Sequence, residues 1–169
     1  MKKITLITGG QRSGKSSFAE KMALSLNSNP TYMATSRVWD EEHRKRIEIH
    51  QKNRGSEWIN IEEDKILSKH NLIGKTVLID CITLWATNFF FDLNSNVEAS
   101  LAALKTEFDT LTSQEAHFIF VTNEIGMGEM SQNELQRKFA DLQGWFNQYV
   151  ASHADEVYLL VSGIAMKIK

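Results

Sequence analysis

The stretch GGQRSGKS at residues 9–16 constrains the fold of this chain more than any other. It matches the pattern G-x-x-x-x-G-K-[ST], which forms a loop that cradles phosphate groups. Before it, the apolar, β-branched run KITLITGG at 3–10 predicts a buried strand, and after it SSFAEKMALSL at 16–26 has helical spacing. A glycine turn that only joins a strand to a helix is the alternative. The full spacing between a strand and a helix favours the phosphate loop, which is typical of α/β folds.

The residue types in this stretch each have a chemical reason. Gly9 and Gly14 let the backbone turn tightly, so that its N–H groups point inward at phosphate oxygens. The helix that begins here adds the positive end of its dipole. We expect Lys15 to reach the β- and γ-phosphates of a nucleoside triphosphate and to act in catalysis. We expect the hydroxyl of Ser16 to ligate Mg²⁺.

The rest of the chain alternates apolar strands with helical segments. We predict further strands at 31–36, 57–63, 75–81, 117–124 and 156–163, and further helices at 41–55, 95–114 and 133–154. This alternation indicates a parallel sheet covered on both faces, with right-handed crossovers. The predicted fold class is α/β, a P-loop NTPase-type three-layer fold with a mostly parallel sheet flanked by helices. No repeat, linker or low-complexity tract interrupts the chain, so we predict a single domain over residues 1–169.

Composition restricts the classes of partner. The 169 residues are 42% apolar and 24% charged, as is typical of a globular domain. A net charge of −2 provides no global basic field that would attract nucleic acid or an acidic membrane. The single cysteine, Cys81, excludes an intrachain disulfide and suits a reducing cytosol. The first apolar run ends at Gly9, too early for a signal peptide, and no run reaches the ~20 apolar residues of a membrane span. We therefore expect a cytoplasmic protein without stable membrane insertion.

A carboxylate at the end of another strand supports the magnesium site. Asp80 follows the apolar run VLI, in the place of a Walker B aspartate, although an aspartate there could also simply end the strand. We predict that Asp80 is catalytic and, with Ser16, a ligand of Mg²⁺. Asn123 and Glu124 should lie at the same carboxyl edge of the sheet, where ligands bind in such folds. Glu124 could be a base, a neighbour of the metal or a solvated loop acid, and the residues alone leave this open. These residues predict a Mg²⁺-dependent nucleotide-binding enzyme whose acceptor they do not identify.

The helix expected at 41–55 carries a row of basic side chains. At about 100° per residue, His43, Arg46, His50 and Arg54 fall within an arc of roughly 80° on one face. We predict that Arg46 and Arg54 bind nucleotide phosphates, because guanidinium groups match phosphate oxygens. Nearby cations favour the neutral imidazole of His50, the form that can attack phosphorus to give a phosphoramidate. The alternative is a charged face that is only solvated, and the spacing does not decide between the two.

Several stretches together make the chain similar to a known enzyme family. The chain contains, in this order, ITGGQRSGKSSFAE, YMATS, RIEIHQKNRGSEW, LIDCITLWATN, VTNEIGMG and LQGWFNQYVASHADEVYLLVSGIAMKIK. From Ile4 to Lys169 it resembles the bifunctional adenosylcobinamide kinase / adenosylcobinamide-phosphate guanylyltransferase family of cobalamin biosynthesis. The more specific stretches are VTNE-x-GMG, R-I-x-x-H-x-x-x-R and VSG-I-x-x-K-I-K.

The resemblance implies a trimeric P-loop enzyme with two reactions and sites formed between subunits. ATP or GTP would first phosphorylate the aminopropanol hydroxyl of adenosylcobinamide, the corrinoid partner. GMP from GTP would then be transferred to that phosphate, which releases pyrophosphate and gives adenosylcobinamide-GDP. In the family the GMP passes through a covalent histidine, which corresponds to His50 here. The implied nucleotide contacts are Gly9, Gly10, Gln11, Arg12, Ser13, Gly14, Lys15, Ser16, Ala34, Thr35, Ser36, Gln51, Lys52, Asn53, Arg54 and Glu62.

The chain departs from the family pattern at two places. Some members have two adjacent histidines where this chain has Ile49 and His50, and His43 has no counterpart, so we assign it no role. The loop after GMG, EMSQNE, lacks the proline of many members, and this loop could contact the acceptor. The aromatic run at 85–91 could also hold a corrinoid or could be core.

Two other functions fit part of the sequence. A relative that keeps only the kinase reaction is one. A P-loop switch or a nucleic-acid-stimulated ATPase is the other, but the near-neutral charge and the lack of a basic-aromatic run argue against it. The Asn/Thr-Lys-x-Asp signature of switch GTPases is also missing.

Overall fold

The computed structural model describes residues 1–37 and 55–169. The helix predicted at 41–55 lies outside the described residues except for Gly55. The predicted site residues Arg46, His50 and Gln51 to Arg54 lie outside them as well.

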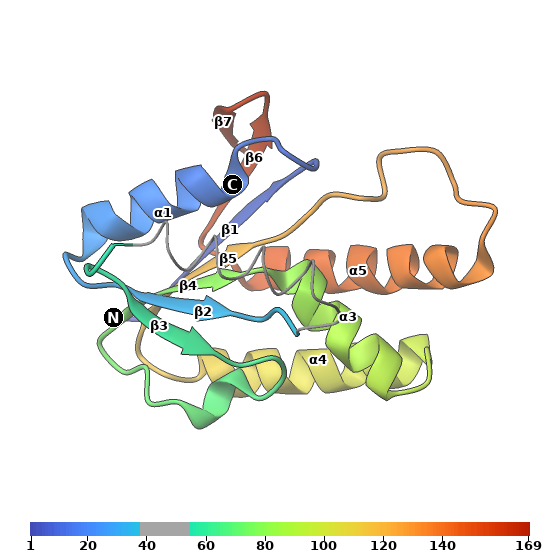
Figure 1. Ribbon diagram of the computed structural model, residues 1–169, viewed down its shortest axis with the longest axis horizontal. Coiled ribbons are helices and arrows are strands. Elements are labelled where there is room, and N and C mark those ends of the chain that lie inside the picture. Colours follow the sequence, from blue (N-terminus) through green and yellow to red (C-terminus); the bar gives the residue numbers. More distant parts are fainter. Residues whose placement is uncertain (38–54) are drawn as a thin grey trace.

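The described chain alternates strands and helices around one sheet (Figure 1). Its elements are β1 (Lys3–Gly9), α1 (Lys15–Leu26), β2 (Thr31–Ala34), β3 (Ile59–Glu62), the short 3₁₀ helix η1 (Leu67–Lys69), β4 (Thr76–Asp80), α3 (Ile82–Asp92), α4 (Val97–Thr112), β5 (His117–Val121), α5 (Glu134–His153), β6 (Glu156–Val161) and β7 (Ile164–Lys167). Each predicted strand and helix that falls on described residues is confirmed, with ends that differ by a few residues. Within the described residues, no helix is long and apolar enough to cross a bilayer.

The described residues form a seven-stranded sheet in the order β3-β2-β4-β5-β1-β6-β7. Among these described strands, the pairs from β3 to β6 are parallel, and β6 and β7 pair antiparallel. The predicted mostly parallel sheet is therefore confirmed. Because β5 lies between β1 and β4, the strand before the phosphate loop and the strand that ends at Asp80 are not neighbours. Both end at the same carboxyl edge, as parallel strands must.

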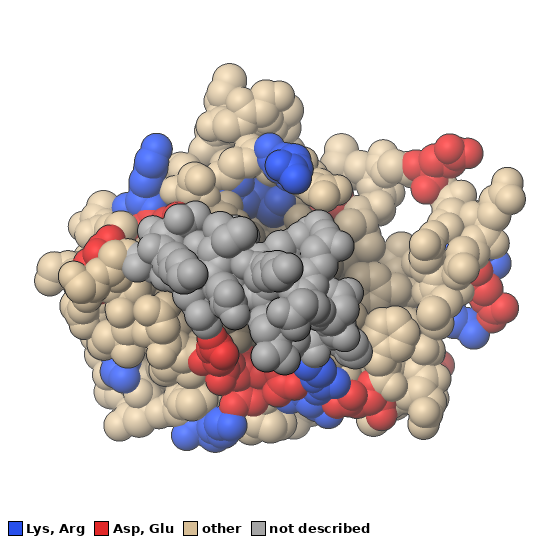
Figure 2. All heavy atoms as spheres, viewed as in Figure 1, with Lys and Arg blue, Asp and Glu red and all other residues tan. Residues whose placement is uncertain are grey.

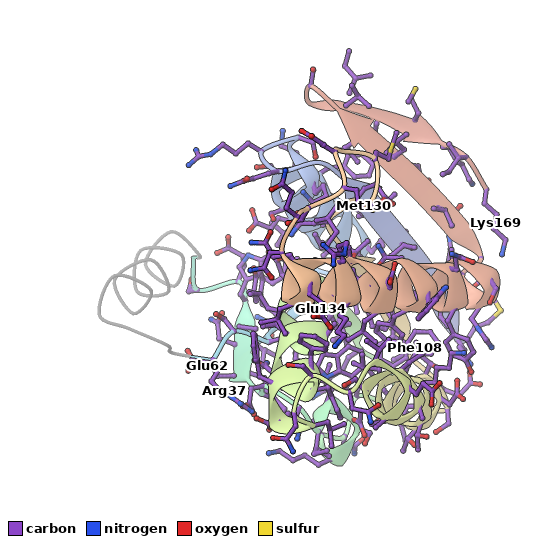
Figure 3. The ribbon with its side chains drawn as sticks, turned by 90° about the vertical axis from the view of Figure 1, so that its right-hand side faces the viewer. Arg37, Glu62, Phe108, Met130, Glu134 and Lys169 are labelled. Carbon is purple, nitrogen blue, oxygen red and sulfur yellow. The ribbon has the colours of Figure 1, made fainter. Side chains whose placement is uncertain are left out.

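Helices cover both faces of the sheet, which gives three layers (Figure 1). Side chains alternate along β5, so Phe118 and Phe120 join one core and Ile119 and Val121 join the other. The first core lies under α3, α4 and α5, and the second lies under α1. Figure 3 shows Phe108 of α4, which is fully buried and packs against Phe120 and Phe146. The near-continuous apolar strands of the sequence follow from this double coverage.

Three elements were not predicted from the sequence, namely the short η1, helix α3 and strand β7. Helix α3 carries the aromatic run 85–91, in which Trp85 and Phe90 are fully buried while Phe91 is 47% exposed. The run is therefore mostly core. Because apolar residues lie on nearly all sides of this helix, the sequence showed no one-sided pattern that would predict it. Strand β7 follows a turn at Ser162 and Gly163, whose positive φ values of 51° and 82° reverse the chain.

Candidate functional site

The phosphate loop lies between β1 and α1 and is already shaped for an anion. Gly14 and Arg12 adopt left-handed φ values of 95° and 57°, which fold the backbone back on itself before the helix begins at Lys15. The side chain of Lys15 is buried, and its Nζ donates to the carbonyl oxygen of Gly10 at 2.7 Å. Burial lowers the pKa of Lys15, and the nearby Cys81 and Asp80 act in the opposite direction. The partly desolvated ammonium of Lys15 and the N-terminus of α1 therefore lie together at the loop, where both favour a bound anion.

The turn between β6 and β7 supports the phosphate loop from behind. The N–H of Gly163 donates to the carbonyl oxygen of Ser13 at 2.9 Å. A Cβ atom on Gly14 would lie 3.2 Å from the Cα of Gly163, so the two chains touch backbone to backbone. The hydroxyl of Ser13 is buried and has no hydrogen-bond partner among the described residues. A phosphate oxygen would supply that partner, which fits the predicted role of Ser13.

Gly9 is expected to be intolerant of a side chain. An added Cβ would lie 2.5 Å from the carbonyl oxygen of Leu160, which β6 holds in the sheet, and 2.7 Å from the Oγ of Ser13. We expect Gly9→Ala to lower the free energy of unfolding by about 1–3 kcal/mol, as overpacking does. Gly10→Ala is the matched control, since nothing lies within 4 Å of its Cβ position. Urea unfolding measures both, and equal stabilities of the two variants would contradict the close packing.

Asp80 ends β4 at the carboxyl edge and faces the phosphate loop. Its Oδ2 accepts a hydrogen bond of 2.6 Å from the hydroxyl of Tyr32 on β2, which fixes the carboxylate. Its charge acts on the pKa of Lys15, so the structure brings these two predicted residues together. The next residue, Cys81, is buried, and burial raises the pKa of its thiol to about 12. The thiol of Cys81 is therefore held in its neutral form, while the carboxylate of Asp80 lies at the end of the strand.

Thr35 lies just after β2 and bonds to the backbone beside Asp80. It is fully buried, and its hydroxyl donates to the carbonyl oxygen of Cys81 at 2.8 Å and accepts from its N–H at 2.9 Å. The side chain of Asn88 on α3 donates to the carbonyl oxygen of Thr35 at 2.8 Å. Thr35 thus positions the end of β4 with its side chain, while its neighbours Ala34 and Ser36 are half-buried at the sheet edge.

Thr35→Val is expected to cost about 1–3 kcal/mol of stability, because it leaves the buried N–H of Cys81 without its acceptor. Thr31→Val on β2 is the matched control. The hydroxyl of Thr31 is buried and has no partner within the described chain, so its loss should change stability by no more than about 0.5 kcal/mol. Thermal unfolding of the two variants measures the difference. Similar losses in both would show that the hydroxyl of Thr35 does no more than fill space.

An ion-pair network lies at the outer end of this edge. Arg37 donates through Nε to Asp64 at 2.6 Å and through both terminal nitrogens to Asp92 at 2.8 and 3.1 Å. Together with Lys65, Arg37 holds the pKa of Asp92 well below its usual range. Figure 3 shows Arg37 near Glu62, the predicted nucleotide contact that ends β3. No sequence pattern predicts this network, because Arg37, Asp64 and Asp92 lie far apart along the chain.

The segment after β5 joins the phosphate loop to two helices. The N–H of Glu124 donates to the carbonyl oxygen of Gly9 at 3.0 Å, and its Oε1 accepts from the N–H of Gly126 at 3.1 Å. Asn123 is held on both sides, because its N–H donates to the Oγ1 of Thr83 and its carbonyl oxygen accepts from Gln143. Gln143 is fully buried on α5. Nothing in the sequence of this helix distinguishes Gln143 from its exposed polar residues, so its role was not predicted.

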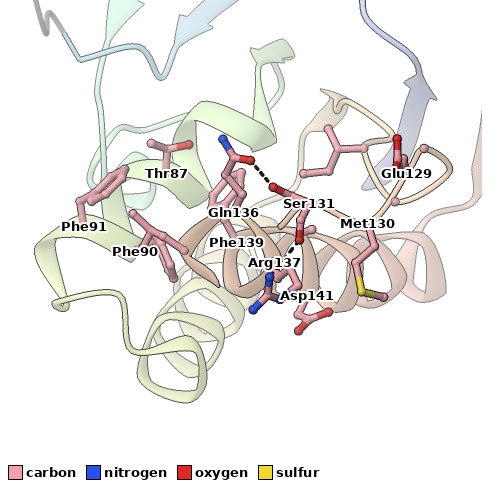
Figure 4. Close-up of a pocket in the computed structure, with 15 residues that line it drawn as sticks. Thr87, Phe90, Phe91, Glu129, Met130, Ser131, Gln136, Arg137, Phe139 and Asp141 are labelled. Atoms are coloured by element: carbon pink, nitrogen blue, oxygen red, sulfur yellow. Dashed lines mark hydrogen bonds between the residues drawn. The ribbon is translucent and has the colours of Figure 1, made fainter. Parts of the chain in front are cut away.

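A groove opens beside this segment, between α3, the loop 125–131 and the start of α5 (Figure 4). Its volume is about 690 Å³. The aromatic side chains of Phe90, Phe91 and Phe139 lie at one end of it and Met130 at the other. Polar groups, including those of Arg137 and Asp141, come from the loop and from α5. The groove is thus an apolar channel with a polar rim.

The surface carries charges of both signs. On the face in Figure 2, Lys and Arg side chains lie beside Asp and Glu side chains. Among the described residues, no group of three or more His, Cys, Asp or Glu side chains could hold a metal ion by itself.

The sequence is similar to proteins of cobalamin biosynthesis. Residues 5–168 match the family described as cobinamide kinase / cobinamide phosphate guanyltransferase. The bifunctional adenosylcobalamin biosynthesis protein CobU of Escherichia coli (strain K12) is 36% identical over 179 residues, which cover 97% of this chain and 98% of that protein. CobP of Pseudomonas aeruginosa is 34% identical over 169 residues, 97% of this chain and 96% of that protein.

Solved structures with a similar fold are more distant in sequence. The flagellar accessory protein FlaH from Methanocaldococcus jannaschii matches with a TM-score of 0.50 at 15% identity, over 99% of this chain and 78% of that one. A prototypical ATPase from the type III secretion system of pathogenic bacteria matches with a TM-score of 0.51 at 12% identity, over 98% of this chain and 56% of that one. These two similarities show the fold alone.

Proposed function

We propose that this chain, which belongs to the cobinamide kinase / cobinamide phosphate guanyltransferase family, catalyses both reactions of cobalamin nucleotide-loop assembly. It phosphorylates the hydroxyl of adenosylcobinamide and then transfers GMP from GTP to that phosphate. The observation that carries the proposal is the family match over residues 5–168, which includes an intact phosphate loop at the carboxyl edge of a parallel sheet.

The phosphate loop binds the triphosphate of ATP or GTP in both reactions. Its N–H groups and the start of α1 contact the phosphates, and the hydroxyl of Ser13 gains the acceptor that it lacks within the described chain. Lys15 exchanges its bond with the carbonyl of Gly10 for a bond with a phosphate oxygen. The phosphate charge then offsets the effect of burial on its pKa.

Mg²⁺ fits the donors at this edge. Ser16 at the first turn of α1 supplies a hydroxyl, and Asp80 supplies a carboxylate that Tyr32 holds in place. Mg²⁺ usually needs only one or two protein ligands, because waters and substrate phosphates supply the others. When bound, Mg²⁺ neutralises negative charge that develops on the transferred phosphate.

In the kinase reaction the acceptor hydroxyl oxygen attacks the γ-phosphorus. A bond forms between these two atoms, the bond to the β–γ bridging oxygen breaks, and the nucleoside diphosphate leaves. Lys15 stabilises the charge on the phosphate oxygens throughout. The hydroxyl proton must pass to a base, and Glu124 supplies a carboxylate at this edge that can take it while Asp80 holds the metal.

In the guanylyltransferase reaction we assign the nucleophile to His50. Its neutral imidazole attacks the α-phosphorus of GTP, a P–N bond forms, and pyrophosphate leaves. A phosphate oxygen of the phosphorylated acceptor then attacks the same phosphorus, which breaks the P–N bond and restores the histidine. The motif R-I-x-x-H-x-x-x-R supports this assignment and gives Arg46 and Arg54 the role of binding the phosphates.

Three further features of the protein are proposals from the family resemblance. We propose that the chain forms a trimer, that residues 34–36, 51–54 and Glu62 contact the nucleotide, and that the enzyme acts in the cytoplasm. Sedimentation equilibrium tests the trimer directly, since a monomer has a mass of 19.3 kDa.

One experiment separates this function from its alternatives. The protein is incubated with cobinamide, Mg²⁺ and GTP, and the corrinoid products are resolved by chromatography and mass spectrometry. We expect cobinamide phosphate first and cobinamide-GDP second. Cobinamide phosphate alone would leave a kinase that has lost the second reaction. Nucleotide hydrolysis stimulated by DNA or RNA, without either product, would favour the ATPase alternative.

A further inference from the structure

We propose that the groove between α3, the loop 125–131 and α5 binds the corrin ring of the acceptor. This inference rests on the proposed function and adds to it the place where the acceptor is held. The groove has a volume of about 690 Å³. It is separate from the phosphate loop, whose residues do not line it.

Hydrogen bonds through Glu124 link the wall of the groove to the strand end that leads into the phosphate loop. Glu124 donates its N–H to the carbonyl oxygen of Gly9 in the phosphate loop at 3.0 Å. Its carboxylate accepts at 3.1 Å from the N–H of Gly126, which lines the groove. A single residue therefore spans from the nucleotide site to the groove wall. An acceptor seated in the groove can extend its hydroxyl across Glu124 to the γ-phosphate.

The lining matches the chemistry of a corrinoid. A corrin is a broad ring with apolar faces and methyl groups, and amide side chains surround its periphery. Phe91, Phe139, Met130 and Leu135 offer apolar contacts to the faces of such a ring. Asp141 in the rim can accept hydrogen bonds from peripheral amides. A groove of this kind, apolar with a few polar groups, is the usual form of a small-molecule site.

Hydrogen bonds hold the loop side of the groove in place. Arg137 of α5 donates from one terminal nitrogen to the carbonyl oxygens of Ser131 and Gln132, at 2.9 and 2.7 Å. The hydroxyl of Ser131 also hydrogen-bonds the side chain of Gln136, as Figure 4 shows. Met130 is 80% exposed beside these anchors, in the loop that Figure 3 shows close to the start of α5. The groove therefore keeps its shape while the exposed thioether adapts to a ligand.

The groove can be filled without touching the nucleotide site. Ala140 lines it from α5, and Ala140→Trp places an indole in the space of the ring. We expect the KM for cobinamide to rise by about tenfold or more, because overlap with the indole excludes the ring. The KM for GTP should stay unchanged. Gln148→Trp is the matched control, since it adds the same side chain at an exposed position of α5 away from the groove.

A second variant and a direct binding measurement keep the test decisive even if Ala140→Trp does not fold. Met130→Ala trims an exposed side chain and should weaken cobinamide binding by a few-fold. Equilibrium dialysis of dicyanocobinamide, followed by the visible absorbance of the corrin, measures binding to the wild type and all three variants. Weakened binding in Ala140→Trp and Met130→Ala, but not in Gln148→Trp, is the expected result.

Two results would overturn the inference. Unchanged cobinamide affinity in both groove variants would place the ring elsewhere. A changed sedimentation coefficient in Ala140→Trp with unchanged cobinamide affinity would show that a second copy of the chain occupies the groove. Both outcomes differ from failure of the proposed function, in which the wild type itself would produce no phosphorylated cobinamide.

Discussion

Replacing Lys15 by alanine is expected to lower kcat/KM of both reactions by about 10²–10³-fold, the range seen when one preorganised donor to a transition state is removed. Lys15 is buried at the start of α1, where its ammonium bonds the loop carbonyl of Gly10. Its loss would remove this positive charge from the phosphate oxygens of a bound triphosphate. The loss should appear in both reactions, because we assign them one triphosphate site.

Lys21→Ala is the control for this variant. Lys21 lies on the same helix and is exposed, so its loss should leave both reactions within about a factor of two. Steady-state kinetics with cobinamide measures the kinase reaction, and kinetics with cobinamide phosphate measures the second. A Lys15→Ala variant that lost only the kinase reaction would contradict the shared site and require a separate site for GTP.

Replacing His50 by alanine is expected to abolish GMP transfer and leave the kinase reaction within a few-fold of wild type. The reason is chemical, because the imidazole forms a bond to phosphorus only in the second reaction. His43→Ala is the matched control, since it removes a histidine of the same predicted helix to which we assign no role. Formation of cobinamide-GDP from cobinamide phosphate and GTP is the measurement. Retained GMP transfer in His50→Ala would remove His50 from the mechanism.

The parts of the site that follow one another along the chain were predictable. The spacing of Gly14, Lys15 and Ser16 predicts a loop between a strand and a helix, and β1 and α1 confirm it. Asp80 was predicted at a strand end and lies there at the same edge as the loop. These predictions succeeded because a local pattern fixes local structure and parallel strands share an edge.

The parts of the site that depend on distant residues were not predictable. The bonds between Thr35 and the backbone of Cys81 join residues 46 positions apart, and Arg37 reaches Asp92 across 55 positions. Neither pair has a spacing that a helix or a strand would bring together. The groove is also a product of packing, because α3, the loop 125–131 and α5 form it only once all three are assembled.

The position of β5 shows a similar limit. The apolar runs predicted β1, β4 and β5 as strands of one sheet, but their order was open. In the structure β5 separates β1 from β4, and this brings Glu124 next to Gly9. The loop that leads into the groove is thus placed by strand order, which no single segment encodes.

The most direct test of the two-step account is covalent labelling of the protein by GTP. The wild type is incubated with Mg²⁺ and GTP labelled with ³²P at the α-phosphate, then denatured and freed of nucleotide. We predict one label per chain that is lost in acid, stable in alkali and absent from His50→Ala, while GTP labelled at the γ-phosphate leaves none. An unlabelled wild-type chain that nevertheless converts cobinamide phosphate to cobinamide-GDP would contradict the guanylyl-histidine.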